Sequence, residues 1–119
     1  MSEVSLTLIV LRSRDIARSA AFYGRLGLQF NLHRHGSGPE HLSSELAGGG
    51  VFELYPIDNG TTVVGTRIGF RVPSVDQAVV ALAEYQGAVV SMPGESEWGR
   101  RAVVLDPDGN KVELTQINR

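Results

Sequence analysis

The chain has 119 residues, a formal net charge of −2 and no cysteine. This length corresponds to one domain, which buries roughly two thirds of the surface that the unfolded chain exposes. The near-neutral charge excludes a basic field for nucleic acid, and the lack of cysteine excludes disulfides and thiolate chemistry. No apolar run is long enough to span a bilayer, and the N-terminus lacks the pattern of a signal peptide. We therefore expect a cytoplasmic protein that binds neither nucleic acid nor membrane.

In the first half of the chain we predict a strand, a helix and three more strands. The first strand runs from Ser5 to Arg12, and its mostly apolar sequence predicts burial on both faces. Asp15 is a good N-cap for the helix, which is predicted to end at the Leu26-Gly27 step. The later strands of this half are predicted at residues 29–34, 41–46 and 51–55.

The second half repeats this order. After a strand at residues 66–72, Ser74 caps a helix and forms a capping-box arrangement with Gln77. Gly87 provides the left-handed conformation that stops this helix. The later strands of this half are predicted at residues 88–91, 101–105 and 111–116.

The two halves lie in register along the sequence. The two helix caps, Asp15 and Ser74, are 59 residues apart, and Glu53 and Glu113 are 60 apart. A period of this length is longer than a solenoid repeat, so it indicates two fused copies of one small module. The modules cover about residues 1–60 and 61–119, with a linker from Ile57 to Gly65. Two such halves are expected to bury their apolar faces and to leave a shared cleft.

Two groups of motifs carry a resemblance to a known family. They are Leu8 to Ile16, Ser19 to Tyr23 and Leu26 to Leu28 near the start, and Trp98 to Arg100, Asp106 to Asn110 and Val112 to Leu114 near the end. Together they resemble the signatures of the vicinal oxygen chelate superfamily. That group includes glyoxalase I, the bleomycin and fosfomycin resistance proteins, extradiol dioxygenases and methylmalonyl-CoA epimerase.

The resemblance implies a fold but not one activity, because this scaffold supports many chemistries. The implied fold is a single α+β domain over residues 1–119, built from two tandem βαβββ modules. Their mixed sheets would form an open, barrel-like arrangement with a cleft inside and the helices outside. Members of the superfamily generally complete their pockets by pairing modules or subunits, so the resemblance also implies a homodimer.

Strand parity predicts which side chains line the cleft, because alternate residues of a strand face opposite sides. The apolar residues of each closing strand should pack on the helices, and the residues between them should face the cleft. On this basis the predicted lining consists of Leu8, Glu53, Arg67 and Glu113, with Tyr55 and Arg71 nearer the edge.

The resemblance also bears on metal binding. In metal-dependent members of the superfamily, the four central cleft positions carry the ligands. Two of these positions match here as Glu53 and Glu113, but the others are Leu8 and Arg67. Neither leucine nor a guanidinium has a lone pair to donate, and zinc, nickel and iron favour imidazole ligands. We therefore predict no metal and no other cofactor, with Arg67 within salt-bridge distance of one or both glutamates.

This cluster has two interpretations. A buried arginine between two glutamates forms a structural salt bridge in most proteins. Alternatively, Arg67 and Arg71 bind an anionic group of a ligand while Glu53 or Glu113 acts as a general base. The second interpretation makes the two glutamates candidate catalytic residues.

Histidine and tryptophan supply the remaining candidates. His33, His35 and His41 surround a glycine-rich segment, which indicates exposed histidines at a hairpin loop more than a metal site. Of the three, His41 is expected to have the best access to the mouth of the cleft. Trp98 either stacks on a flat ligand or covers a sheet edge or dimer contact. The segment 106–110 is interpreted as a tight turn.

Two classes of function remain open from the sequence. The first is a metal-independent protein that binds a small anionic or polar metabolite, like the bleomycin-resistance branch of the superfamily. The second is a glyoxalase-like lyase or isomerase that uses Glu53 and Glu113 with an unconventional metal site. A purely structural or regulatory module is a third class. The sequence leaves open whether the protein is an enzyme.

Overall fold

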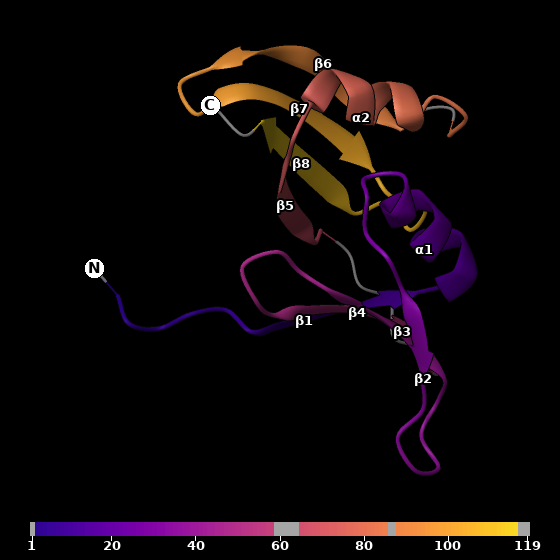
Figure 1. Cartoon of the computed structure of the whole chain (residues 1–119). Coiled ribbons are helices and arrows are strands. Elements are labelled where there is room, and N and C mark those ends of the chain that lie inside the picture. Colours follow the sequence, from indigo (N-terminus) through magenta and orange to yellow (C-terminus); the bar gives the residue numbers. More distant parts are fainter. Residues whose placement is uncertain (1, 59–64, 86–87, 117–119) are drawn as a thin grey trace. The chain divides into compact units, whose positions relative to one another are not determined.

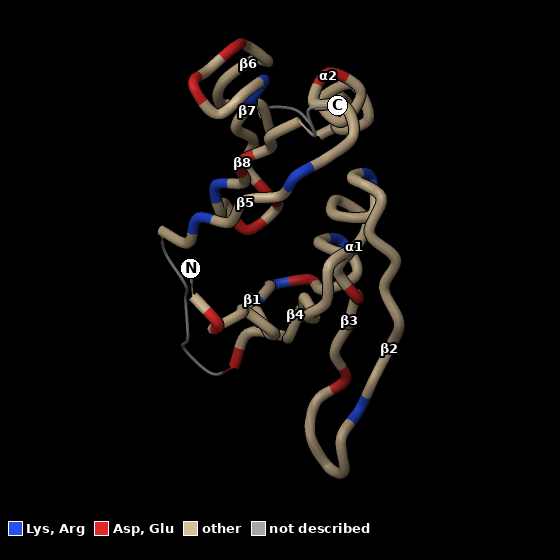
Figure 2. Tube along the Cα trace, turned by 60° about the vertical axis from the view of Figure 1, so that its left-hand side comes forward, with Lys and Arg blue, Asp and Glu red and all other residues tan. Residues whose placement is uncertain are grey.

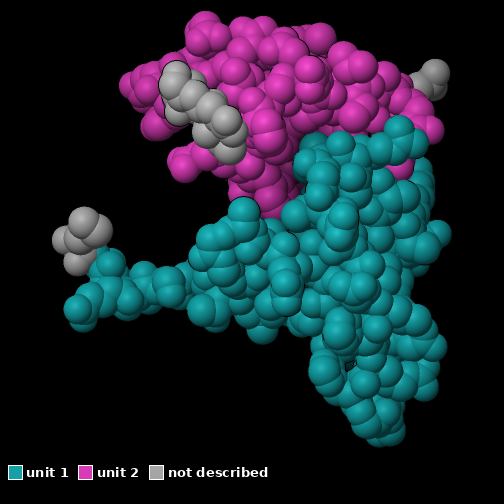
Figure 3. Space-filling model, in the orientation of Figure 1, with its two compact units in different colours: residues 1–62 teal, residues 63–119 magenta. Residues whose placement is uncertain are grey.

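The structure is a computed structural model that describes residues 2–58, 65–85 and 88–116. The chain divides into two compact units, residues 1–62 and 63–119, and each unit is described by itself (Figure 3). Part of the predicted linker from Ile57 to Gly65 lies outside the described residues. So does Gly87, the predicted end of the second helix.

Unit 1 contains one four-stranded mixed sheet and one helix. Its elements are β1 (Leu8–Ser13), α1 (Ile16–Gly24), β2 (Asn31–His33), β3 (His41–Glu45) and β4 (Val51–Pro56). The strand order is β1-β4-β3-β2, in which β1 and β4 are parallel and the other pairs are antiparallel. Helix α1 packs against β1, β3 and β4, and so covers one face of this sheet.

Unit 2 repeats the arrangement of unit 1. Its elements are β5 (Arg67–Val72), α2 (Val75–Ala81), β6 (Val89–Ser96), β7 (Gly99–Leu105) and β8 (Lys111–Gln116). The order is β5-β8-β7-β6, with β5 and β8 parallel and the other pairs antiparallel. Helix α2 packs against β6, β7 and β8 and lies over one face of the sheet (Figure 1).

The predicted fold class is confirmed. The order of elements is βαβββ followed by βαβββ, which makes the chain an α+β protein of two tandem modules. Each sheet is open, with outer strands β1 and β2 in one unit and β5 and β6 in the other, and neither closes into a barrel. No helix in the described ranges is long and apolar enough to cross a membrane.

Both predicted helix caps form, but both helices end early. The Asp15 carboxylate accepts a hydrogen bond from the Arg18 amide at 3.1 Å, and the Ser74 hydroxyl accepts one from the Gln77 amide at 3.2 Å. Helix α1 ends at Gly24 because the next amides bond three residues back, which tightens the chain into 3₁₀-type turns. Gly27, at φ 108°, follows these turns. Similar three-residue bonds follow Ala81 in α2.

The core of each unit lies between the helix and the covered face of its sheet. In unit 1, the Tyr23 ring contacts Phe22 and Phe52 edge-on, with ring centroids 5.2 and 4.9 Å apart. In unit 2, Leu82 at the end of α2 and Leu114 of β8 are fully buried. The predicted parity of the closing strands is therefore confirmed, since their alternate apolar residues are the buried ones.

The prediction that the first strand is buried on both faces is wrong. Leu11 is 5% exposed, whereas Leu8 is 52% exposed and Val10 is 40% exposed. The physical reason is that α1 covers one face of the sheet, so alternate residues of β1 point to the face without a helix. The strand also begins later than predicted, at Leu8 rather than Ser5.

Candidate functional site

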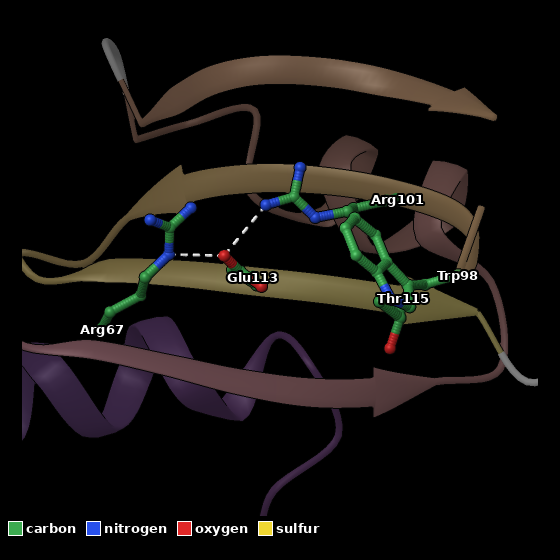
Figure 4. A pocket seen from close by; sticks show the side chains of 5 residues that line it. All are labelled: Arg67, Trp98, Arg101, Glu113 and Thr115. Atoms are coloured by element: carbon green, nitrogen blue, oxygen red, sulfur yellow. Dashed lines mark hydrogen bonds and ion pairs between the residues drawn. The ribbon is translucent and has the colours of Figure 1, made fainter. Parts of the chain in front are cut away.

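The uncovered face of the unit 2 sheet carries a pocket of about 580 Å³, which we call the arginine pocket. Five side chains line it: Arg67, Trp98, Arg101, Glu113 and Thr115 (Figure 4). All five belong to unit 2. The pocket combines two cations, one carboxylate, one hydroxyl and one large aromatic surface.

Strand register brings these side chains to one face. Glu113 of β8 lies opposite Gly69 of β5 and Val103 of β7, and Arg101 lies opposite Thr115. Basic positions recur along β5, as Figure 2 shows in blue. Because successive residues alternate, Arg100 points to the helix side of β7. There it forms a two-bonded ion pair with Asp76 of α2, at 2.6 and 2.8 Å.

Glu113 is the centre of the pocket's ion-pair network. Its Oε1 atom accepts hydrogen bonds from Arg67 Nε and from Arg101 Nη2, the latter at 2.9 Å (Figure 4). The hydrogen bond from Arg101, followed by that from Arg67, lowers the pKa of Glu113, although desolvation opposes the shift. Glu113 is therefore an ionised hydrogen-bond acceptor at neutral pH.

The expected pairing of Arg67 with Glu113 is confirmed, and the pair is only partly buried, which favours the ligand-binding interpretation over a buried structural salt bridge. The Arg67 side chain is 53% exposed and that of Glu113 is 30% exposed. Arg67 lies on the outer strand of a sheet whose face carries no helix of unit 2, so water reaches the guanidinium. The pair is thus accessible to a ligand from solvent.

Sequence reasoning missed Arg101. The predicted strand began at this residue, so its parity was not assigned. Extending the alternation from Val103 back to Arg101 would have placed this guanidinium beside Glu113, since the register pairs Val103 with Glu113. The sequence held little signal for this, because Ala102, Val103 and Val104 form one apolar run in which all three residues are buried.

Trp98 lines the pocket, whereas Arg71 does not. Trp98 precedes β7 and is 68% exposed, and its backbone amide donates to the Ser96 hydroxyl at 3.2 Å. The Ser96 hydroxyl in turn donates to the Gly99 carbonyl at 2.6 Å, which fixes the turn that carries the indole. Arg71 lies on the same face opposite Thr115, but it is not among the residues that line the pocket.

In unit 1, the corresponding sheet face carries a stacked aromatic cluster around His41. The His41 and Tyr55 rings are stacked, with centroids 4.1 Å apart and planes at 8°. His41 Nε2 lies 3.4 Å from the Tyr55 hydroxyl and 3.5 Å from Glu53 Oε2. The Arg12 guanidinium lies 5.2 Å from the centroid of the Tyr55 ring. Glu53 thus has a histidine as its neighbour in this unit.

The expectation that His41 is accessible is wrong. Its side chain is 1% exposed, because Tyr55 stacks on it and the rings of His33 and His35 lie within 6.0 and 5.0 Å of it. His33 and His35 are themselves exposed, as predicted for a hairpin. Leu8 is exposed on β1. A cleft that joins these unit 1 residues to Arg67 and Glu113 stays a prediction.

The donor set does not fit a transition metal. Leu8 has no donor atom, and the Arg67 guanidinium donates to Glu113 rather than accepting. Across residues 2–58, 65–85 and 88–116, no group of three or more His, Asp or Glu side chains is arranged to hold a metal ion. In unit 2, a carboxylate that two guanidiniums hold matches a hydrogen-bonding pocket better than a metal centre.

Comparisons with known proteins give a family and one relative. The sequence model of the Glyoxalase/Bleomycin resistance protein/Dioxygenase superfamily matches residues 5–114. An uncharacterized protein of Mycolicibacterium smegmatis is 31% identical over 115 residues, which cover 92% of this chain and 91% of that protein.

Solved structures share the fold. TnmS3, an antibiotic binding protein from Streptomyces sp. CB03234, is similar with a TM-score of 0.73 at 27% identity, over 99% of both chains. A glyoxylase/bleomycin resistance protein/dioxygenase domain from Frankia sp. EAN1pec has a TM-score of 0.75 at 22% identity, again over 99% of both chains. The second likeness shows the fold alone.

Proposed function

This chain belongs to the Glyoxalase/Bleomycin resistance protein/Dioxygenase superfamily, and we propose that it binds a small anionic or polar molecule in the arginine pocket without a transition metal. The observation that carries the proposal is the pairing of two solvent-accessible guanidiniums, Arg67 and Arg101, with an exposed indole, Trp98. Arginine presents a planar fork of donors that suits carboxylate and phosphate groups.

The remaining lining supports a ligand with both polar and apolar parts. Trp98 offers a flat apolar surface, and Thr115 offers a hydroxyl. A volume of about 580 Å³ falls in the range of small-molecule pockets. The likeness to TnmS3, which is described as an antibiotic binding protein, supports a role in binding rather than turnover. We keep Arg71, Leu8 and Tyr55 as proposed contributors to ligand binding, and the buried His41 would act only through its stacking on Tyr55.

A thermal-shift screen with anionic, neutral and cationic small molecules tests the proposal. Anionic compounds should raise the melting temperature of the wild type in a concentration-dependent way, because a ligand that binds the folded state stabilises it. The same compounds should have little effect on Arg67→Gln combined with Arg101→Gln. Arg18→Gln, which removes an exposed guanidinium from α1, is the matched control and should respond like the wild type. Stabilisation by cationic compounds alone would contradict the proposal.

We also propose that the protein is a cytoplasmic homodimer whose second copy covers the N-terminal apolar stripe. This stripe consists of Val4, Leu6, Leu8 and Val10, which are 87, 74, 52 and 40% exposed. It covers the segment before β1 and the first part of β1, an outer strand of its sheet. Exposed apolar edge strands favour association with another chain.

Light scattering coupled to size exclusion tests the dimer. The wild type should have about twice the chain mass of 12.8 kDa. Leu6→Lys should shift the population toward monomer, because burying an unpaired ammonium in an interface is unfavourable. Val80→Lys, at an exposed apolar residue of α2, should leave the mass unchanged. A monomeric wild type at the concentrations of the ligand screen would contradict this part of the proposal.

A glyoxalase-like lyase or isomerase that uses Glu53 and Glu113 is the second candidate. The contact of 3.5 Å between His41 Nε2 and Glu53 favours it, because a histidine beside a carboxylate can hold that carboxylate in the orientation of a general base. Its test is turnover of the hemithioacetal of methylglyoxal and glutathione, with and without added zinc or nickel. Turnover that Glu53→Gln abolishes would favour this candidate, and no turnover is expected for the binding protein.

A further inference from the structure

The two arginines of the pocket keep most of their donors free. Each guanidinium has five N–H donors, and Glu113 uses one from Arg67 and one from Arg101. Neither arginine has another hydrogen-bond partner among the described residues. The pocket therefore offers several unpaired N–H groups, and its lining has a net charge of +1 from two guanidiniums and one carboxylate.

Glu113 is asymmetric in its bonding. Both arginines bond to Oε1, and the second oxygen, Oε2, has no hydrogen bond or ion pair with a described residue (Figure 4). The carboxylate is ionised, because Arg101 and then Arg67 lower its pKa, so Oε2 can only accept. An anion that bonds to the free guanidinium donors comes close to this negative charge and is repelled by it, unless it brings a donor of its own.

We propose that the ligand belongs to the class of hydroxy acids, in which a hydroxyl group lies on the carbon next to the anionic carboxylate. The carboxylate accepts from Arg67 and Arg101, and the adjacent hydroxyl donates to Glu113 Oε2. This inference rests on the proposed function, because it specifies the ligand of the same pocket. In this arrangement the carboxylate of Glu113 binds the hydroxyl group of the ligand, and so it selects hydroxy acids over anions that it would repel.

The selectivity follows from the chemistry of an unpaired acceptor. A ligand without the hydroxyl removes water from Glu113 Oε2 and leaves it without a partner, which is unfavourable. A hydrogen bond to a charged group contributes about 1.5–3 kcal/mol, which corresponds to a difference of about tenfold or more in affinity. Trp98 gives a second contact for a ligand that also carries a ring.

Mandelate and phenylacetate are suitable probes, because both have one ring and one carboxylate, and they differ by the hydroxyl group. Trp98, the single tryptophan of the chain, reports binding through its fluorescence, and calorimetry gives an independent affinity. The wild type should bind mandelate about tenfold more tightly than phenylacetate. Glu113→Met, which keeps the length of the side chain and replaces the carboxylate by a thioether that is only a weak acceptor, should bind both with similar affinity.

Two further variants assign the hydroxyl contact. Glu45→Met removes a carboxylate from β3 in unit 1 and should keep the preference for mandelate. Thr115→Val removes the other oxygen that lines the pocket and should also keep it. Loss of the preference in Thr115→Val, with retention in Glu113→Met, would overturn the role of Glu113.

The ratio of the wild-type affinities for mandelate and phenylacetate tests the inference even if a variant does not fold. Equal affinities for mandelate and phenylacetate would overturn the inference and leave the binding of anions in the pocket intact. Binding of neither probe, together with a thermal-shift screen in which no anion stabilises the protein, would overturn the proposed function as well.

Discussion

At the scale of single residues, Arg67 has a small effect on stability and a large one on the pocket. Its guanidinium is 53% exposed, and Glu113 keeps Arg101 as a partner when Arg67 is removed. Exposed ion pairs contribute about 0–1 kcal/mol. Arg67→Ala should therefore lower the free energy of unfolding by less than about 1 kcal/mol in urea denaturation. A loss of several kcal/mol would mean that the pair is buried in the folded protein.

Glu113 should make stability depend on pH. Its pKa in the folded protein lies below the ordinary glutamate value, because Arg101 and Arg67 bond to the ionised form. The ion pairs of Glu113 therefore stabilise the folded protein at pH values above the ordinary glutamate pKa. This stabilisation is lost as the pH falls through the lowered pKa of Glu113 in the folded protein. Thermal melts of the wild type and Glu113→Gln should differ at pH 7 and converge in the acid range. A difference in melting temperature between the two proteins that grows toward acid pH would contradict this prediction.

At the scale of elements, the helices of the two modules are capped in the same way at their N-termini. The Asp15 and Ser74 side chains each accept from the amide three residues on, at 3.1 and 3.2 Å. Asp15→Ala and Ser74→Ala should each lower stability by about 1 kcal/mol. Chemical denaturation measures this, with Ser37→Ala in the exposed hairpin loop as a control that should change little. If neither cap variant differed from that control, the caps would not stabilise the helices.

The sequence predicted the elements well wherever a local pattern decides them. Alternating apolar residues placed β4 and β8 correctly, and Asp15 and Ser74 marked the helix starts. The helix ends were less predictable, because both helices tighten into three-residue turns before the glycine that was expected to stop them. Those turns depend on how the last turn packs on the sheet, and side-chain spacing does not encode this.

The candidate site was also predicted in part from the sequence. Parity placed Arg67 and Glu113 on one face, but Arg101 was missed because the continuous apolar run from Ala102 to Val104 in its strand shows no alternation. The position of His41 was also mispredicted. Its burial arises from ring contacts with His33 and His35 across the β2–β3 hairpin and with Tyr55 of β4. Contacts of this kind depend on tertiary structure and leave no signal in local sequence.

At the scale of the whole molecule, the two modules share a fold but differ in the chemistry of their uncovered sheet faces. Unit 2 presents Arg67, Arg101 and Glu113 as an accessible charged pocket. At the matching position of unit 1, Glu53 lies against a buried histidine and is 15% exposed. The two modules therefore carry a glutamate at the matching position in different surroundings. This difference is the reason why we assign ligand binding to the arginine pocket of unit 2.

The most direct test of this assignment is an anion titration followed at the Trp98 indole by NMR. The chain has one tryptophan, so the indole N–H gives a single signal from a residue that lines the arginine pocket. The account predicts a saturable shift of this signal with a bound anion in the wild type, and its loss in Arg67→Gln combined with Arg101→Gln. Binding that calorimetry detects while the Trp98 signal stays unchanged, or that both glutamine substitutions leave intact, would contradict it.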